Sequence, residues 1–232
     1  MPPYRTNIRR SRRFRSKRRT PRTRKAIIPR TLQPRTKLIK IRSVDYQNHT
    51  HASGAIAVAK IQHNSIDDPF TSLGTGQPLG YDQYKALYKK AIVLASRCFA
   101  EVHNNTSTAI MVGITAVPYN QGTTALTTYE HYMEAPNTKH RLLSPDVDRA
   151  NMSMQMSTKK LLQIKNYKDN KTELEIDLNA ETPPTNLSYW HLWSQPQDQI
   201  TETTGTALQL TITMEYIVLL TDPIIPARSV ET

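Results

Sequence analysis

The sequence has its highest density of charged side chains in an arginine-rich run close to its N-terminus. Eight of the eleven residues from Arg9 to Arg19 are basic, and seven of those eight are arginines. A planar guanidinium forms paired hydrogen bonds with phosphate and stacks on unpaired bases, and each phosphate contact releases condensed counterions. Such a run therefore predicts binding to single-stranded nucleic acid, without base specificity. The residues that we expect to contact phosphate, and to serve in nuclear import, are Arg5, Arg9, Arg10, Arg12, Arg13, Arg15, Lys17, Arg18, Arg19, Arg22, Arg24 and Lys25.

The same basic run has two other interpretations, a nuclear-localisation signal alone or a generic patch for anionic surfaces. A membrane surface fits less well, because the run has no apolar face to enter the lipid interface. Like charges at every spacing oppose a compact form, and few apolar side chains offset the entropy of ordering. Prolines also exclude a long helix. We therefore expect residues 1–36 to be a flexible, disordered arm in the free protein.

Charge is divided sharply along the chain. The net charge is +12, but the first 44 residues contain thirteen arginines, four lysines and no acidic residue, which gives that segment +17. The remaining fourteen basic and nineteen acidic residues give the rest of the chain −5. A basic arm on a mildly acidic body is expected to be two physical units. We expect an arm at residues 1–36, a folded domain at 37–222 and a C-terminal tail at 223–232, with no basic groove on the acidic body.

Other patterns that carry chemistry are weak. His49 and His51 can share one face of a strand, but no third metal ligand lies near them in sequence, so surface or interface positions are expected. Glu130-His131 has no positioned nucleophile beside it. Cys98 lies within an apolar run and is typical of a small buried side chain. No glycine-rich phosphate loop occurs. The sequence therefore predicts no enzyme, no cofactor and no metal.

Membrane segments and disulfides are not expected either. No apolar run approaches the roughly 18 residues that a membrane-spanning helix needs. The first apolar pair is Ile27-Ile28, so we expect no secretory leader and no membrane insertion. One cysteine cannot form an internal disulfide, which agrees with folding in a reducing compartment.

The body has the two-residue periodicity of β-strands. The clearest case places Leu208, Leu210 and Ile212 on one face, and the alternation continues to Leu220. Further strands are predicted at 37–44, 55–61, 109–117, 152–157, 174–178 and 188–194. A short helix or turn followed by a strand is expected within 81–103, and short helices at 128–133 and 159–164. About eight strands separated by long loops predict an all-β antiparallel sandwich. Trp190 and Trp193 fall on opposite faces of their strand, so we expect one in the core and the other at a subunit interface.

These elements resemble, in their order, the capsid proteins of circoviruses and related circular single-stranded-DNA viruses that encode a replication initiator. The arginine-rich arm, the stretch Pro78-Leu79-Gly80-Tyr81-Asp82-Gln83-Tyr84, the aromatic strand Tyr189–Trp193 and the long final strand carry the resemblance. It implies an eight-stranded antiparallel jelly roll that self-assembles, in about sixty copies, into an icosahedral shell. It also implies packaging of circular single-stranded DNA, entry into the host nucleus through an import receptor, and attachment to a cell-surface factor through outer loops.

Two alternatives remain open at this point. The chain can instead be a monomeric or small-oligomer nucleic-acid-binding regulator, which particle size would distinguish from a coat protein. It can also be the coat protein of an RNA or satellite virus, since phosphate contacts carry no base or sugar information. The expected locations are the virion and the host nucleus.

Overall fold

The folded body is built of two antiparallel β-sheets. The structure is a computed structural model, and it describes residues 34–51, 55–70, 76–118, 126, 128–145, 148–197 and 206–224. These residues belong to one compact unit, residues 33–232. The first sheet has the strand order β1-β9-β3-β6, formed by β1 (Thr36–His51), β9 (Thr206–Pro223), β3 (Tyr88–Asn104) and β6 (Asp148–Ser157). The second has the order β2-β8-β4-β5, formed by β2 (Ala57–Gln62), β8 (Tyr189–Pro196), β4 (Ile110–Val117) and β5 (Thr138–Leu143).

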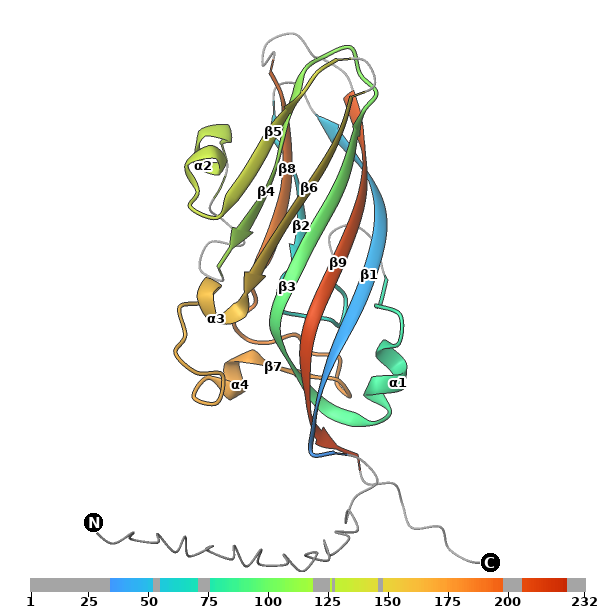
Figure 1. The fold of residues 1–232 in the computed structure, drawn as a ribbon, viewed down its shortest axis with the longest axis vertical. Coiled ribbons are helices and arrows are strands. Elements are labelled where there is room, and N and C mark those ends of the chain that lie inside the picture. The colour runs from blue at the N-terminus through green and yellow to red at the C-terminus, as the bar shows by residue number, and fades with distance from the viewer. Residues whose placement is uncertain are drawn as a thin grey trace, which may run out of the picture. The chain divides into compact units, whose positions relative to one another are not determined.

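This strand order is that of a jelly roll. The chain passes from one sheet to the other between β1 and β2, β2 and β3, β3 and β4, β5 and β6, β7 (Glu175–Asp177) and β8, and β8 and β9. All neighbouring strands are antiparallel, and Figure 1 shows the two layers facing each other. Two packed sheets with four main strands each and these crossings form the double Greek key of a jelly roll, and the short β7 adds a fifth strand to the first sheet. The predicted all-β, eight-stranded antiparallel jelly-roll sandwich is therefore confirmed for the described residues.

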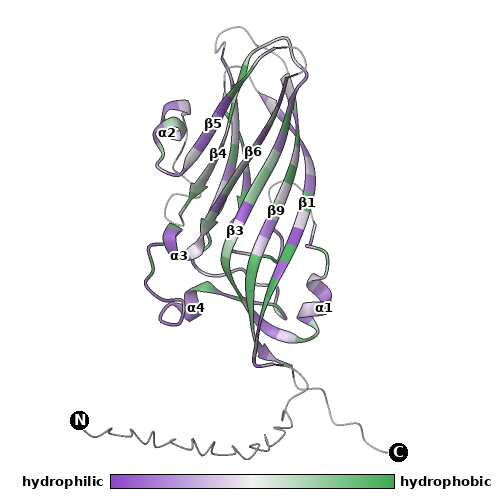
Figure 2. Cartoon of the chain, viewed as in Figure 1, coloured by the Kyte–Doolittle hydropathy of each residue, from purple (hydrophilic) through white to green (hydrophobic). Residues whose placement is uncertain are grey.

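The core lies between the sheets, where the alternating apolar side chains meet. On β9, Leu208, Leu210 and Ile212 all point inward and are buried, as the two-residue pattern predicts. The same alternation appears as green and purple bands along the strands in Figure 2. Polar bridges cross the core as well. The Trp190 indole Nε1 donates to Ser96 Oγ at 2.9 Å, and the Tyr216 hydroxyl donates to the carbonyl of Gln62 at 2.7 Å.

Several elements differ from the sequence predictions. β5 was not predicted, and the predicted strand at 174–178 is helix α4 (Lys171–Leu174) followed by the short strand β7 (Glu175–Asp177), which pairs with β3. Three further short helices are α1 (Tyr81–Lys85), α2 (Tyr129–Glu134) and α3 (Thr158–Leu161), close to the predicted positions. β3 also has a bulge between Val93 and Ala95. Within the described ranges, no helix combines the length and apolarity that crossing a membrane requires.

The two tryptophans of β8 are both fully buried, which corrects the prediction for Trp193. Trp190 lies in the core, but Trp193 points to the outer face of the second sheet, where α2 covers it. The Trp193 ring lies 5.4 Å from the ring of Tyr132, and its Nε1 donates to Thr115 Oγ1 at 3.0 Å. Opposite it, a Cβ added to Gly113 would lie 2.3 Å from the indole. Trp193 therefore belongs to a second, smaller buried cluster between α2 and the second sheet, and it is not exposed for contact with another subunit.

Candidate nucleic-acid interface

The twelve basic residues predicted to bind phosphate, from Arg5 to Lys25, lie outside the described residues. The described chain starts at Pro34, and strand β1 starts two residues later at Thr36. Basic residues continue beyond the arm: Arg35 lies just before β1, and Lys37, Lys40 and Arg42 lie on it. The sheet that contains β1 is called here the arm-bearing sheet, because the arm joins it covalently.

The outer face of the arm-bearing sheet carries a row of charged side chains from neighbouring strands. Arg42 on β1 pairs in register with Glu215 on β9, and Glu215 pairs in register with Arg97 on β3. Lys40, two residues before Arg42, lies on the same face, and its Nζ contacts Glu215 Oε2 at 2.9 Å. Three cations thus surround one carboxylate. We call Lys40, Arg42, Arg97 and Glu215 the charged row.

The electrostatics of the charged row favour an anion. The hydrogen bond from Lys40, together with the nearby charges of Arg97 and Arg42, holds the pKa of Glu215 below its usual value. The carboxylate is therefore ionised at neutral pH and cancels one of the three positive charges. Arg42 and Arg97 are exposed, and Arg97 Nη2 donates to Ser153 Oγ on β6 at 3.3 Å. The cluster therefore keeps a net positive charge at the surface.

A shallow hollow lies beside the charged row. Its cavity volume is about 150 Å³, and its lining residues are Lys40, Ala95, Ser96, Arg97, Gln155, Glu215 and Ile217. The hollow lies next to the β3 bulge, which ends at Ala95, and Ala95 has only a methyl group to fill the space. The lining combines an apolar part, from Ala95 and Ile217, with charged and amide groups.

Aromatic and apolar side chains continue the same face beyond the charged row. Phe99 follows Arg97 by two residues on β3 and is half-buried, and Tyr46 follows Arg42 by four residues on β1 and is 56% exposed. Alternation places both on the outer face with the cations. Val44 and Leu38, on the same face of β1, are exposed at 57% and 61%. The outer face of the arm-bearing sheet therefore offers cations and aromatic rings together.

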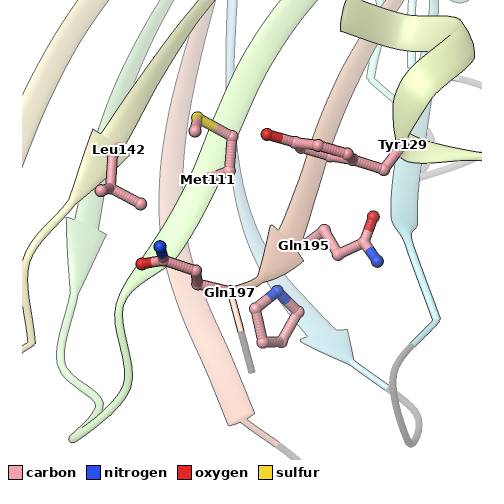
Figure 3. A pocket seen from close by; sticks show the side chains of 6 residues that line it. Met111, Tyr129, Leu142, Gln195 and Gln197 are labelled. Atoms are coloured by element: carbon pink, nitrogen blue, oxygen red, sulfur yellow. The ribbon is translucent and has the colours of Figure 1, made fainter. Parts of the chain in front are cut away.

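The outer face of the second sheet has a different character. Helix α2 covers part of it, and the Tyr132 hydroxyl forms a 2.9 Å hydrogen bond with His191 Nδ1 on β8. Beside α2 is a pocket of about 110 Å³, lined by Met111, Tyr129, Leu142, Gln195, Pro196 and Gln197. Figure 3 shows the Tyr129 side chain reaching from α2 over the strands toward Met111. This pocket has no basic side chain in its lining, so it does not provide a phosphate site.

The histidines that were considered as metal ligands are buried between the sheets. His49 Nδ1 and His51 Nε2 both contact Ser194 Oγ on β8, at 3.0 and 2.8 Å. Burial, with a smaller effect of His51, lowers the pKa of His49 to about 4. This corrects the expectation of surface or interface positions. The described residues contain no group of three His, Cys, Asp or Glu side chains placed to hold a metal ion.

A third buried histidine joins the sheets at another point. His63 follows β2, its Nδ1 contacts Ser188 Oγ at 3.0 Å, and its Nε2 contacts the Met156 carbonyl of β6 at 3.2 Å. Burial lowers the pKa of His63 to about 4. Its ring also lies 5.4 Å from that of Trp190. His63 is therefore a neutral structural bridge at physiological pH.

Cys98 and the Glu130-His131 pair have no catalytic arrangement. Cys98 is fully buried, and burial raises the pKa of its thiol to about 12, so it stays protonated and shielded. Glu130 and His131 are exposed on α2, and the Glu130 side chain hydrogen-bonds to Thr128, the residue just before the helix, which is a contact of a helix start and brings no base to a nucleophile.

Sequence reasoning missed the charged row, although one signal was present. Lys40 and Arg42 alternate with buried Ile39 and Ile41 inside a predicted strand, which already places two cations on one outer face. Their partners Arg97 and Glu215 are distant in sequence, and only the register of the β1-β9-β3 sheet brings them together.

Comparisons with known proteins give structural likeness at low sequence identity. No protein-family model matches the sequence, and no curated protein matches it. Among solved structures, Desmodium yellow mottle tymovirus is 19% identical over 89% of this chain and 99% of that chain, with a TM-score of 0.40. The decameric BFDV capsid protein is 9% identical over 80% and 99%, with a TM-score of 0.44. Mud crab tombus-like virus is 9% identical over 85% and 94%, with a TM-score of 0.47. The jelly-roll assignment itself rests on the strand order of the two sheets.

Proposed function

We propose that this chain is a viral coat protein, a jelly-roll subunit that assembles with copies of itself and packages single-stranded nucleic acid through its arginine-rich arm. The observation that carries the proposal is the combination of a jelly-roll body with seventeen cations and no acidic residue in the first 44 positions. The rest of the chain, with a net charge of −5, cannot neutralise that segment, so the natural partner of the segment is an external polyanion.

Assembly is supported by the ends of the two sheets. Strands β1 and β6 end the first sheet, and β2 and β5 end the second. A strand at a sheet edge presents backbone donors and acceptors that proteins cover or pair to avoid uncontrolled association. β1 is sixteen residues long and carries exposed Leu38, Val44 and Tyr46. Lateral contacts between identical subunits would cover these edges in a closed shell.

The proposed cargo is a circular single-stranded DNA genome. About sixty copies of a +17 segment would supply about a thousand positive charges, on the order of the phosphate count of a genome of one to two kilobases. We also propose that the arm directs import into the host nucleus through an import receptor, and that exposed loops attach the virion to a cell-surface factor. The virion and the host nucleus are the corresponding locations.

Particle size tests the proposal against a small nucleic-acid-binding regulator. The purified full-length protein would be sized by chromatography and imaged by negative stain, in low salt and after nuclease treatment. Closed, uniform shells support a coat protein. A monomer or small oligomer under all conditions contradicts it and supports the regulator.

The cargo is identified separately by extracting nucleic acid from washed particles. Sensitivity to DNase and to a single-strand nuclease, with resistance to RNase and exonuclease, supports circular single-stranded DNA. Sensitivity to RNase with resistance to DNase would replace that cargo with RNA and support the coat protein of an RNA or satellite virus.

A further inference from the structure

We propose that the outer face of the arm-bearing sheet is a second binding surface for single-stranded nucleic acid, distinct from the arm. Lys40, Arg42 and Arg97 would contact backbone phosphates, and Phe99 and Tyr46 would stack on bases. The class of ligand rests on the proposed function, and the inference extends it by assigning part of the binding to the folded body.

The first support is the charge balance of the charged row. Lys40, Arg42 and Arg97 come from two different strands and converge around Glu215 of the strand between them. Arg42 and Arg97 are in register with Glu215, and Lys40 lies two residues from Arg42 on the same face. The single carboxylate of Glu215 cannot neutralise these three cations. The Lys40 side chain is 62% exposed although it contacts Glu215, and the guanidinium groups of Arg42 and Arg97 are open to solvent. Two positive charges therefore remain accessible to a phosphate.

The second support is the shape and lining of the hollow. Ala95 and Ile217 provide apolar surface, while Lys40, Arg97 and Gln155 provide cations and an amide. A nucleotide has the complementary combination, a charged phosphate joined to a base with an apolar face. The hollow belongs to a rigid sheet, because β3 pairs with β9 from Tyr88 to Asn104 and with β6 from Ala95 to Asn104.

The third support is the position of the aromatic rings relative to the cations. Phe99 and Arg97 are separated by two residues on one strand, which is about 7 Å along the sheet surface. Tyr46 extends the same face on β1, four residues beyond Arg42. A single strand of nucleic acid that lies across the sheet would place its phosphates at the cations and its bases on the aromatic rings. Stacking of this kind tolerates any base, as packaging of a whole genome requires.

The fourth support is continuity with the arm in the sequence. Arg30, Arg35, Lys37, Lys40 and Arg42 continue the basic residues of the arm into β1, at spacings of two to five residues. Nucleic acid held by the arm is therefore tethered to the start of this sheet. The tether raises the effective concentration at the face, so three cations suffice for a site that would be weak alone.

The test measures the salt dependence of binding by the full-length chain, at dilutions where subunits do not assemble. The probe is an oligothymidylate of about twenty nucleotides. Each single-strand phosphate contact contributes about 0.7 to the slope of log K against log salt, so K40Q/R42Q/R97Q, which removes the two accessible positive charges, should lower the slope by about 1.4. The variant E215Q removes the competing carboxylate and should tighten binding at every salt concentration. Circular dichroism and thermal unfolding establish that each variant is folded.

A matched control removes the same charge elsewhere on the body. Lys160, Lys165 and Lys168 are exposed in the segment from α3 to α4, and K160Q/K165Q/K168Q should leave the slope within 0.5 of the wild-type value. Photocrosslinking with bromodeoxyuridine in the oligomer should label peptides that contain Phe99 or Tyr46. R42K/R97K keeps the charge and should keep most of the slope.

Two results would overturn the inference. The first is an equal slope for the row variant and the control variant, with crosslinks confined to the arm. The second is a row variant that alters shell formation while its slope equals that of the control, which would assign this face to a contact between subunits. In both results the deciding quantity is the slope, which is measured on unassembled subunits, so failure here is distinguishable from failure of the proposed coat-protein function.

Discussion

Acidification should loosen the sandwich through its buried histidines, and His63 provides the sharpest case. His63 is fully buried and bridges the two sheets through Ser188 and the Met156 carbonyl. Its pKa falls from 6.5 to about 4 on folding because burial penalises the charged ring. A shift of that size corresponds to about 3 kcal/mol of folding free energy.

The sign follows from proton binding. Between the two pKa values the unfolded chain binds a proton at His63 and the folded chain does not, so acid favours unfolding. The contribution of His63 to the free energy of unfolding is complete above pH 6.5, falls as the pH drops, and is lost near pH 4. His49 has a similarly lowered pKa of about 4 and is 6% exposed. The two histidines together approach the 5–15 kcal/mol total stability typical of a domain.

Urea unfolding of dissociated subunits at several pH values from 7.5 to 4 measures this effect. The wild-type free energy of unfolding should fall steeply between pH 6.5 and 4. In His63→Gln, which cannot titrate, that fall should be smaller by about 3 kcal/mol. His140→Gln is the control, because His140 is exposed on β5, and its pH dependence should match the wild type. Parallel curves for His63→Gln and the wild type would refute the reasoning.

Three further predictions concern the packing of the body. Gly113→Ala places a methyl group 2.3 Å from the Trp193 indole, so it should lower the free energy of unfolding by about 1–3 kcal/mol in urea titrations, and an unchanged midpoint would contradict the contact. Trp190→Phe removes the hydrogen bond to Ser96 and should cost about 1–3 kcal/mol, with Ser96→Ala in the same background adding little in a double-mutant cycle. The Cys98 thiol should not react with a thiol reagent in the native state and should react fully in urea, and rapid native labelling would show that it is accessible.

The alternating strands were predictable because each side chain's face is set by local periodicity. Strand β9 is the clearest case, since from Leu208 to Leu220 its inward residues are all apolar and its outward residues mostly polar. β5 has no such pattern: of its six residues only Leu143 is buried, because the strand lies at the edge of its sheet. β5 is a strand because it pairs with β4. That pairing is a tertiary contact, so it leaves no periodic pattern of apolar residues in the sequence of β5.

Tertiary contacts also decided the features of the site that sequence reasoning could not find. The burial of Trp193 depends on α2 folding over the outer face of the second sheet. The charged row depends on a register that aligns Arg42, Glu215 and Arg97 across three strands. Composition counted Lys40 and Arg42 with the basic first 44 residues and averaged Arg97 into the acidic remainder of the chain. The position of a few cations on one face is lost in such an average.

The most direct test of the central claim is the nucleic-acid content of particles formed by full-length protein and by protein lacking residues 1–35. A deletion of residues 225–232 serves as the control for loss of a terminus. The ratio of nucleic acid to protein, from absorbance and from phosphate analysis, should be high for the full chain and for the control. It should fall to near zero in particles of the arm-deleted chain, because fourteen of the seventeen cations in the first 44 residues are gone. Particles of the arm-deleted chain with the normal content of nucleic acid would contradict the claim that the arm packages it.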